Sequence, residues 1–180
     1  AKTKDLTKAA IALHKTREAV RKPISKQLVD DLIRLGIAHA QIDIAITNTD
    51  DFTPLGKDDV QFMFAANLNQ SLRRVSEVAS GGEISRIMLC IKALLASKNG
   101  LPTIIFDEID TGVSGEIASQ MGNIMQQMAQ SRQIIAITHL PQIAAKGDTQ
   151  YLVYKADTDT RTETHIRCLT NEERVNQIAT

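Results

Sequence analysis

Apolar residues recur at helical spacing over the first part of the chain. Between Leu6 and Leu35 they follow one another at steps of three, four and seven positions, which is the period of a long amphipathic helix. Pro23 should kink this helix or begin a second segment, and Gly36 is a natural stop. Such a helix could pack on a globular body or form one strand of a coiled coil, and the pattern on either side of the proline is too short to choose.

Alternation with a period of two follows the helix. The run Ile42–Ile46 alternates as a half-buried strand, residues 59–68 contain a second strand, and the segment 48–58 between them is rich in turn-forming residues. We expect a hairpin or two neighbours in an antiparallel sheet. Another hairpin is predicted near the end, with strands at 150–155 and 161–169, and a short helix closes the chain.

The middle of the chain alternates apolar strands with helical spacing. After a linker at 69–79, one helix presents an apolar face that we expect to be core, formed by Ile84, Ile87, Met88, Ile91 and Leu95. Two almost wholly apolar runs, 101–106 and 133–137, then flank a segment with helical spacing at 117–128 and a plausible N-cap at Ser114. Strand, helix and strand in this order describe a right-handed βαβ unit in a buried parallel sheet. The predicted fold class is therefore α/β: a parallel βαβ core with flanking antiparallel strands and a long N-terminal helix.

Composition narrows the class of protein only a little. With 43% hydrophobic, 23% charged and 3% aromatic residues, the 180-residue chain is typical of a globular protein with an aliphatic core, and stacking of bases on aromatic platforms is disfavoured. Lys+Arg and Asp+Glu balance at 21 each, but residues 1–34 carry nine basic and four acidic side chains. Such a surplus is usually a solvated helix face, so contact with DNA is the less favoured interpretation of it.

Cysteine placement and the length of apolar runs bear on the compartment. Cys90 and Cys168 are far apart and lack metal-ligand spacing, so we expect two reduced packing residues rather than a disulfide. No apolar run approaches the roughly 20 residues that span a bilayer, and the N-terminus lacks the apolar core of a signal peptide. The sequence thus predicts a cytoplasmic protein with no membrane partner, and a start at Ala1 without Met suggests a piece of a longer chain.

The stretch Ser80-Gly81-Gly82-Glu83 allows two interpretations. Two glycines let backbone N–H groups approach a ligand closely, and a helix that begins there points the positive end of its dipole at an anion such as phosphate. Alternatively, Ser80 caps the helix and Glu83 reaches back to the Ser80 amide in a capping box. Taken alone, the cap is the commoner meaning of Ser-x-x-Glu.

Polar residues end both apolar runs of the βαβ unit. Asp107 and Glu108 follow the first run and His139 follows the second, so all three should lie at the carboxyl edge of the sheet, where α/β proteins bind ligands. Adjacent carboxylates there repel each other unless a divalent metal uses them. Asp107 could hold Mg²⁺, Glu108 could orient an attacking water, and His139 could donate to a transferring phosphoryl group. Each residue alone also has a structural interpretation, as a cap or a packed histidine.

Four motifs together resemble the C-terminal half of a P-loop ABC-type ATPase head. The string A-S-G-G-E-I-S-R at 79–86 resembles the signature motif, and T-I-I-F-D-E-I-D at 103–110 resembles a Walker B strand with its glutamate. D-T-G-V-S at 110–114 is similar to the D-loop, and T-H-L-P-Q-I-A-A-K at 138–146 to the switch-histidine loop. From about Leu6 into the final helix, the residues are similar to the RecN family, SMC-like ATPases of bacterial DNA repair.

The resemblance implies a role for each matching position in an ATP site shared by two heads. Binding of the γ-phosphate of an ATP held mainly by the second head would fall to Ser80, Gly81, Gly82 and Glu83. Asp107 would serve Mg²⁺, and Glu108 would activate water. Asp110 would communicate across the dimer, and His139 would sense the γ-phosphate. Residues 1–36 would be the end of a coiled-coil arm and its entry to the head, and residues 37–180 the C-terminal lobe of the head.

The same resemblance implies partners and also shows one departure. The implied partners are a second head in a homodimer, the N-terminal half of the same protein, and DNA during recombinational repair of double-strand breaks, in the cytoplasm at the nucleoid. The pattern G-x-x-x-x-G-K-[ST], whose loop cradles the α- and β-phosphates, occurs nowhere in the sequence. We therefore expect no tight ATP binding and no hydrolysis by this chain alone. Two alternatives stay open: the head of another SMC-like or transporter ATPase, and a non-catalytic scaffold, against which the intact Glu108 argues.

Overall fold

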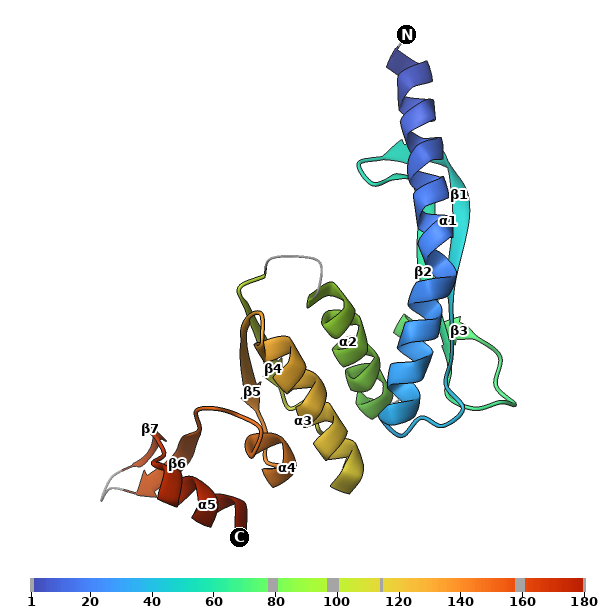
Figure 1. Cartoon of the computed structure of the whole chain (residues 1–180). Coiled ribbons are helices and arrows are strands. Elements are labelled where there is room, and N and C mark those ends of the chain that lie inside the picture. The colour runs from blue at the N-terminus through green and yellow to red at the C-terminus, as the bar shows by residue number, and fades with distance from the viewer. Residues whose placement is uncertain (1, 78–80, 97–100, 114, 158–160, 180) are drawn as a thin grey trace. The chain divides into compact units, whose positions relative to one another are not determined.

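The computed structural model describes residues 2–77, 81–96, 101–113, 115–157 and 161–179. The chain divides into two compact units, Ala1–Ile91 and Lys92–Thr180. The first holds the long helix and an antiparallel sheet, and the second holds the parallel strands and the final hairpin (Figure 1).

The first unit is built on the long helix α1 (Lys2–Arg34), which is continuous through Pro23, so the second segment that proline might begin does not form. The helix packs along a β-hairpin (Figure 1). The stop at Gly36 is confirmed, since its φ of 81° is the left-handed conformation that glycine adopts freely. The amides of Gly36 and Ile37 donate to the carbonyls of Ile33 and Leu32, both at 3.0 Å, which is a Schellman motif.

The predicted antiparallel hairpin is confirmed and is longer than expected. Strand β1 (Gln41–Thr53) pairs with β2 (Gly56–Ala65), because the turn-rich segment between the two apolar runs itself joins the ladder. A short strand β3 (Arg73–Arg74) adds to β2, and a 3-10 helix (Val75–Glu77) follows. Both lie in the segment that the sequence pattern presented as a linker.

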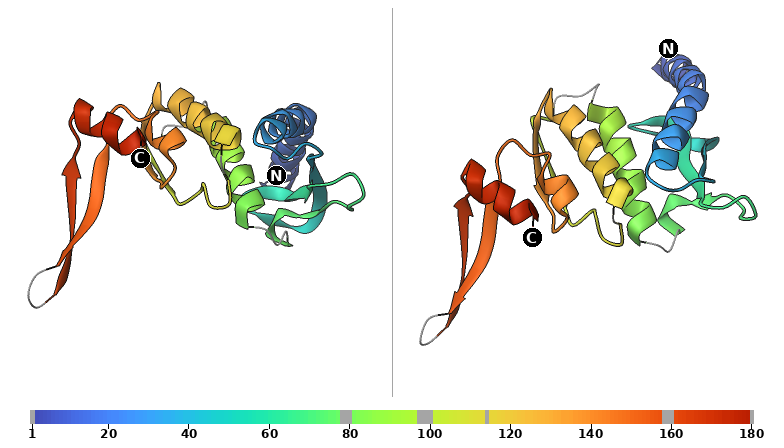
Figure 2. Two further views of the ribbon diagram at one scale, coloured as in Figure 1. Left: turned by 90° about the horizontal axis from the view of Figure 1, so that it is seen from below. Right: turned by 60° about the horizontal axis from the view of Figure 1, so that its bottom comes forward.

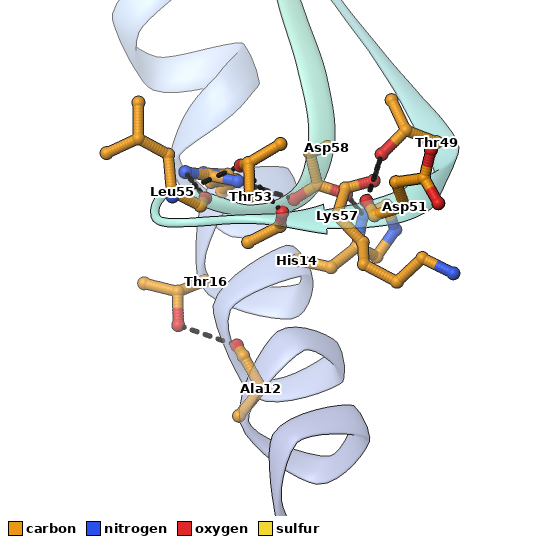
Figure 3. Close-up of polar contacts among 11 residues, drawn as sticks. Ala12, His14, Thr16, Thr49, Asp51, Thr53, Leu55, Lys57 and Asp58 are labelled. Atoms are coloured by element: carbon orange, nitrogen blue, oxygen red, sulfur yellow. Dashed lines mark hydrogen bonds and ion pairs between the residues drawn. The ribbon is translucent and has the colours of Figure 1, made fainter. Parts of the chain in front are cut away.

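Ionic contacts fasten α1 to this hairpin (Figure 3). The carboxylate of Asp58, whose side chain is 2% exposed, lies 2.8 Å from His14 Nδ1 and accepts from Arg17 at 2.8 Å. Arg17 also donates to the carbonyl of Leu55 at 2.7 Å. The Arg17 hydrogen bond, supported by His14, holds the pKa of Asp58 below its ordinary value. Basic residues of the first helix thus bind acidic residues of the sheet.

The core of the first unit is aliphatic, as composition suggested. Its largest fully buried side chains include Leu28, Leu32, Leu35 and Phe64. The first part of α1 carries exposed apolar side chains instead, among them Leu6 at 48% and Val20 at 43%. The apolar stripe of this helix is therefore covered only toward its C-terminal end within the described residues.

Helix α2 (Gly81–Ala96) corrects one expectation about its apolar face. Ile87 is buried as predicted, but Met88 is 41% and Leu95 53% exposed. The buried side of the helix includes Leu89 and Cys90, so it is rotated away from the predicted face, and Met88 and Leu95 are left exposed. Burial raises the pKa of the Cys90 thiol to about 12, which suits an inert packing residue. Both cysteines are reduced, as expected, but Cys168 is exposed, so the prediction that it packs is wrong.

The second unit contains the predicted βαβ arrangement. Strand β4 (Thr103–Asp107) and strand β5 (Gln133–Ile137) pair in parallel, with Asp107 opposite Ile137, and helix α3 (Gly115–Ala129) connects them. Met121, Met125 and Met128 of α3 are buried, at the helical spacing that predicted them. Ser114, the expected N-cap, lies outside the described residues.

One face of this two-stranded sheet is open among the described residues, which corrects the expectation of a buried sheet. Ile104 and Phe106 are 7% and 3% exposed, whereas Ile105 is 60% exposed. Ile135 and Ile137 of β5 are 42% and 53% exposed. The apolar sequence therefore describes a sheet that needs a second covering layer, because apolar side chains on both faces are typical of strands covered on both sides.

The rest of the second unit follows the predicted order. A short helix α4 (Pro141–Ala144) comes after β5, and Gly122 lets it approach α3, since a Cβ there would lie 3.3 Å from the Gln142 carbonyl oxygen. Strands β6 (Tyr151–Asp157) and β7 (Thr162–Cys168) form the second hairpin, side by side in both views of Figure 2. Helix α5 (Asn171–Ala179) closes the chain. Among the described helices, none is long and apolar enough to cross a membrane.

Candidate functional site

The carboxyl edge of the parallel sheet brings together the acidic residues and the histidine singled out in the sequence. Asp107 is the last residue of β4 and Ile137 the last of β5, and the two are paired. The N–H of Glu108 donates to the Ile137 carbonyl at 3.1 Å, so the pairing continues one residue past the strand. Because both strands run the same way, the segments that carry Glu108 and His139 leave the sheet at the same edge.

Glu108 has an unusual backbone conformation. Its φ is 47°, and it is the one non-glycine residue with positive φ among the described residues. Its carbonyl accepts from the Thr111 hydroxyl at 2.9 Å, which closes a tight turn after the strand. A left-handed conformation costs free energy in a residue with a side chain, and such residues are found most often at functional sites. The exposed Glu108 side chain is thus directed by a turn that the surrounding hydrogen bonds maintain.

Asp110 is the buried member of the site. It is 1% exposed, and its Oδ2 accepts a hydrogen bond from the Thr138 hydroxyl. Oδ2 also lies 3.8 Å from His139 Nδ1, while Oδ1 has no hydrogen-bond partner among the described residues. Thr138 was not singled out in the sequence, although a hydroxyl residue directly before the histidine could have drawn attention to it.

The exposed groups at this edge fit nucleotide and metal chemistry. The His139 side chain is 70% exposed, and Asp107 is exposed at the end of its strand. In the described part of the chain, no three His, Cys, Asp or Glu residues converge to hold a metal ion. Magnesium commonly uses one or two carboxylates and completes its shell with water and substrate phosphates. Asp107 therefore fits a metal shared with a phosphate ligand, and it does not fit an all-protein metal cage.

The glycine turn belongs to the first unit, where α2 begins. Ser80 lies outside the described residues, so its two interpretations, cap and phosphate ligand, stay as they were. Gly81 is exposed, its φ is not positive, and a Cβ added there would meet none of the described residues within 4 Å. Neither the backbone conformation nor packing against the described residues thus requires glycine at this position. Gly82 and Glu83 follow it in the first turn of α2 and are partly buried.

Comparison with known proteins finds one group of relatives. No family model matches the sequence. Over 175 residues the chain is 37% identical to the DNA repair protein RecN of Deinococcus radiodurans, an alignment that covers 97% of the chain and 31% of that protein. Over 126 residues it is 42% identical to RecN of Bacillus subtilis, covering 70% of the chain and 22% of that protein. The chain belongs to the RecN family. It spans about a third or less of the length of these RecN proteins and corresponds to a C-terminal part of them.

A solved structure confirms the fold class. The Smc head domain of Pyrococcus yayanosii, solved with a coiled coil and joint, matches with a TM-score of 0.66 at 17% identity, over 87% of this chain and 28% of that one. At this identity the likeness concerns the fold. The RecN-family chain therefore has the fold of part of an SMC-type head, and the predicted resemblance to that class is confirmed.

Proposed function

We propose that this chain supplies the C-terminal part of the ATP-hydrolysing head of a RecN-family protein that acts in recombinational DNA repair. The observation that carries the proposal is the meeting of Asp107, Glu108 and His139 at one edge of the β4–β5 sheet, with Glu108 held in a left-handed turn. Relatives at 37% identity are DNA repair proteins. A scaffold has no need for a strained carboxylate at this edge, so catalysis is favoured over the scaffold alternative.

The residues at this edge have complementary roles in phosphoryl transfer. Magnesium, when bound, would neutralise charge on the phosphates, and Asp107 would hold it directly or through water. Glu108 would accept the proton of the water that attacks the γ-phosphorus, while the bond to the β–γ bridging oxygen breaks and ADP leaves. His139, exposed beside Glu108's loop, would donate a hydrogen bond to a γ-phosphate oxygen.

Other parts of the whole protein would complete this site. The loop that cradles the α- and β-phosphates would come from the portion of the protein outside this chain, since its pattern is absent from the sequence. The turn at Ser80, Gly81, Gly82 and Glu83 would bind the γ-phosphate of an ATP held by the second head of a homodimer. The open space at Gly81 supports the approach of such a ligand.

DNA is a further partner in this proposal, and the protein would act in the cytoplasm at the nucleoid. The structure narrows which residues of the basic first helix could contact DNA. Arg17 and Arg21 bind Asp58 and Asp43, so their charges serve packing on the hairpin. Exposed lysines such as Lys22 are the better candidates, because a phosphate contact needs a charge that reaches solvent.

The decisive experiment restores the rest of the protein and removes one carboxylate. In the full RecN-family protein, Glu108→Gln should lower kcat for Mg²⁺-dependent ATP hydrolysis by about 10²- to 10⁴-fold, the usual contribution of a general base, while ATP binding is retained. Glu116→Gln, at an exposed position in the first turn of α3, is the matched control and should keep activity. A scaffold would have no ATPase activity for Glu108→Gln to remove, and that result would refute the proposal.

A further inference from the structure

A hydroxyl group connects the two loops that carry the proposed catalytic residues. Thr138 directly follows β5 and donates its hydroxyl hydrogen to Oδ2 of Asp110. Its Oγ1 in turn accepts the N–H of Leu140 at 3.0 Å. His139 lies between Thr138 and Leu140 in the sequence. The backbone on both sides of the histidine is therefore fixed by one side chain.

Asp110 is the anchored end of this connection. Its side chain is 1% exposed, and its backbone carbonyl accepts the N–H of Val113 at 3.2 Å. Asp110 lies two residues after Glu108, in the same turn. A buried carboxylate keeps its position because displacing it would leave polar groups unpaired in a dry environment. A side chain that is hydrogen-bonded to Asp110, as Thr138 is, is thus held in a fixed position relative to Glu108.

The carboxylate does not hold the imidazole directly. His139 Nδ1 lies 3.8 Å from Oδ2, which is longer than a hydrogen bond. With the ring 70% exposed, the direct contact restrains it weakly. The hydrogen bonds that connect the loop of His139 to Asp110 run through the Thr138 hydroxyl, which donates to Asp110 and accepts from the Leu140 N–H.

We propose that Thr138 is a positioning residue for ATP hydrolysis, whose hydroxyl, bound to the buried Asp110, sets the loop of His139 against the loop of Glu108. The inference rests on the proposed function. It gives Asp110 a role inside its own chain, which agrees with its burial, in addition to the communication across a dimer that the family resemblance implies. Because Thr138 would act by placing the loop of His139, losing its hydroxyl should slow the chemical step rather than weaken ATP binding.

Two substitutions at one position separate the hydroxyl from the shape of the side chain. Thr138→Val keeps the branched shape and removes the hydroxyl, whereas Thr138→Ser keeps the hydroxyl. In the full protein, we expect Thr138→Val to lower kcat roughly 10- to 100-fold, because a small misplacement of catalytic groups has an effect of this size. The KM for ATP should stay within about twofold, and Thr138→Ser should remain near the wild type. An unchanged kcat in Thr138→Val, or equal damage from both variants, overturns the inference.

A second readout needs no nucleotide. In the 180-residue chain, the Leu140 amide should exchange its hydrogen faster in Thr138→Val than in the wild type, and at the wild-type rate in Thr138→Ser. The ring cross-peaks of His139 in NMR spectra should move in the same variant. Equal Leu140 exchange in all three proteins overturns the inference. If Thr138→Val fails to fold, Thr138→Ala removes the same hydroxyl from a half-buried site and carries the same expectations.

The two proposals fail in different ways. A full wild-type protein without Mg²⁺-dependent hydrolysis, or one in which Glu108→Gln keeps full activity, overturns the proposed function and with it the catalytic role of Thr138. An active wild type that Glu108→Gln inactivates, together with an unaffected Thr138→Val, overturns the positioning role alone. Non-additive losses in the Thr138→Val, Asp110→Asn double variant support the direct connection of the two side chains.

Discussion

At the scale of single residues, Glu108 and Gly81 depart from the ordinary preference of their residue type in opposite ways. Glu108 has a side chain in a backbone conformation that favours glycine, with φ at 47°. Gly81 is a glycine at the start of a helix, where neither its φ nor any described residue near it requires a glycine. Local stability explains neither choice. Under the proposed function, both residues would serve a bound nucleotide.

Gly81→Ala should accordingly separate stability from activity. Alanine favours helix by up to about 1 kcal/mol over glycine, so the midpoint of thermal unfolding of the 180-residue chain should stay the same or rise slightly. In the full protein, ATPase activity should fall, because the added Cβ occupies the space where phosphate would approach. Thermal unfolding by circular dichroism and an ATPase assay measure the two effects. A variant with normal activity would remove Gly81 from the proposed phosphate site.

Glycine 56 offers the matched control for this substitution. Its φ is 99°, and a Cβ there would lie 3.0 Å from Leu13 Cδ2. Gly56→Ala should therefore lower the unfolding midpoint, because it strains the turn and the contact with α1. Loss of stability at Gly56 with none at Gly81 is the pattern expected if the two glycines serve folding and binding respectively.

At this scale, sequence periodicity predicted where the candidate site residues lie in the sheet. It did not predict their backbone conformation or their hydrogen bonds. Asp107, Glu108 and His139 could be placed at one sheet edge because parallel strands end together. The left-handed turn at Glu108 could not be predicted, because Glu108 is not a glycine and the hydrogen bond that holds the turn comes from Thr111. Thr138 was missed for a similar reason, because its partner Asp110 is 28 residues away in the sequence.

At the scale of elements, α1 and the β1–β2 hairpin form one structural piece. Two aspartates of the hairpin, Asp58 and Asp43, bind two arginines of the helix, Arg17 and Arg21. The helical period predicted α1, and alternation predicted the hairpin, but neither pattern could predict that the two elements pack together. The packing of the helix on the hairpin depends on contacts between residues that are separated by 22 and by 41 positions in the sequence. The basic surplus of the first helix, which composition alone left open between solvent and DNA, is explained in part by this packing.

Asp58→Asn tests how much the connection between these elements contributes. The variant loses the charge that Arg17 and His14 both contact, and we expect the free energy of unfolding to fall by about 1–3 kcal/mol at pH 7. Because the pKa of Asp58 is lowered in the folded state, its stabilisation is present above the ordinary carboxyl pKa of 3.8 and is lost as the pH falls through the lower folded value. The difference between variant and wild type should therefore shrink in strong acid. Urea denaturation of variant and wild type at pH 7 and in strong acid measures this difference in the free energy of unfolding.

The neighbouring carboxylate makes a fair comparison for that experiment. Asp59 binds Gln61 on its own strand, at 3.0 Å, and does not connect the helix to the hairpin through that contact. Asp59→Asn should change the free energy of unfolding by no more than about 0.5 kcal/mol, as surface substitutions usually do. If the free energy of unfolding of Asp58→Asn stays below that of the wild type by the same amount in strong acid as at pH 7, the stabilisation is not ionic in origin.

At the scale of the whole molecule, two observations agree with a chain that is part of a longer protein. One is the open face of the β4–β5 sheet among the described residues, and the other is the absence of the phosphate-loop pattern from the sequence. The sequence read as a fully buried sheet because its strands are apolar on both faces, yet Ile105 is 60% and Ile137 53% exposed. Periodicity records the environment in the complete protein, and this chain spans 31% of the length of its relative from Deinococcus radiodurans. The fold of the part could be predicted, but which of its faces would be covered could not.

The chain alone should therefore fail to hydrolyse ATP, and for a structural reason. In the proposed function, Asp107, Glu108 and His139 would act on the γ-phosphate end of the nucleotide, whereas the pattern of the loop that would hold the α- and β-phosphates is absent from the sequence. Titration calorimetry with Mg²⁺ and ATP should show no binding tighter than the millimolar range, and a phosphate-release assay should show no turnover. Adding the remaining portion of the RecN-family protein should restore both, and Glu108→Gln in the restored protein should remove turnover while binding persists. Binding and turnover by the isolated chain would mean that its own residues form a complete nucleotide site, and the division of the site between parts would then be wrong.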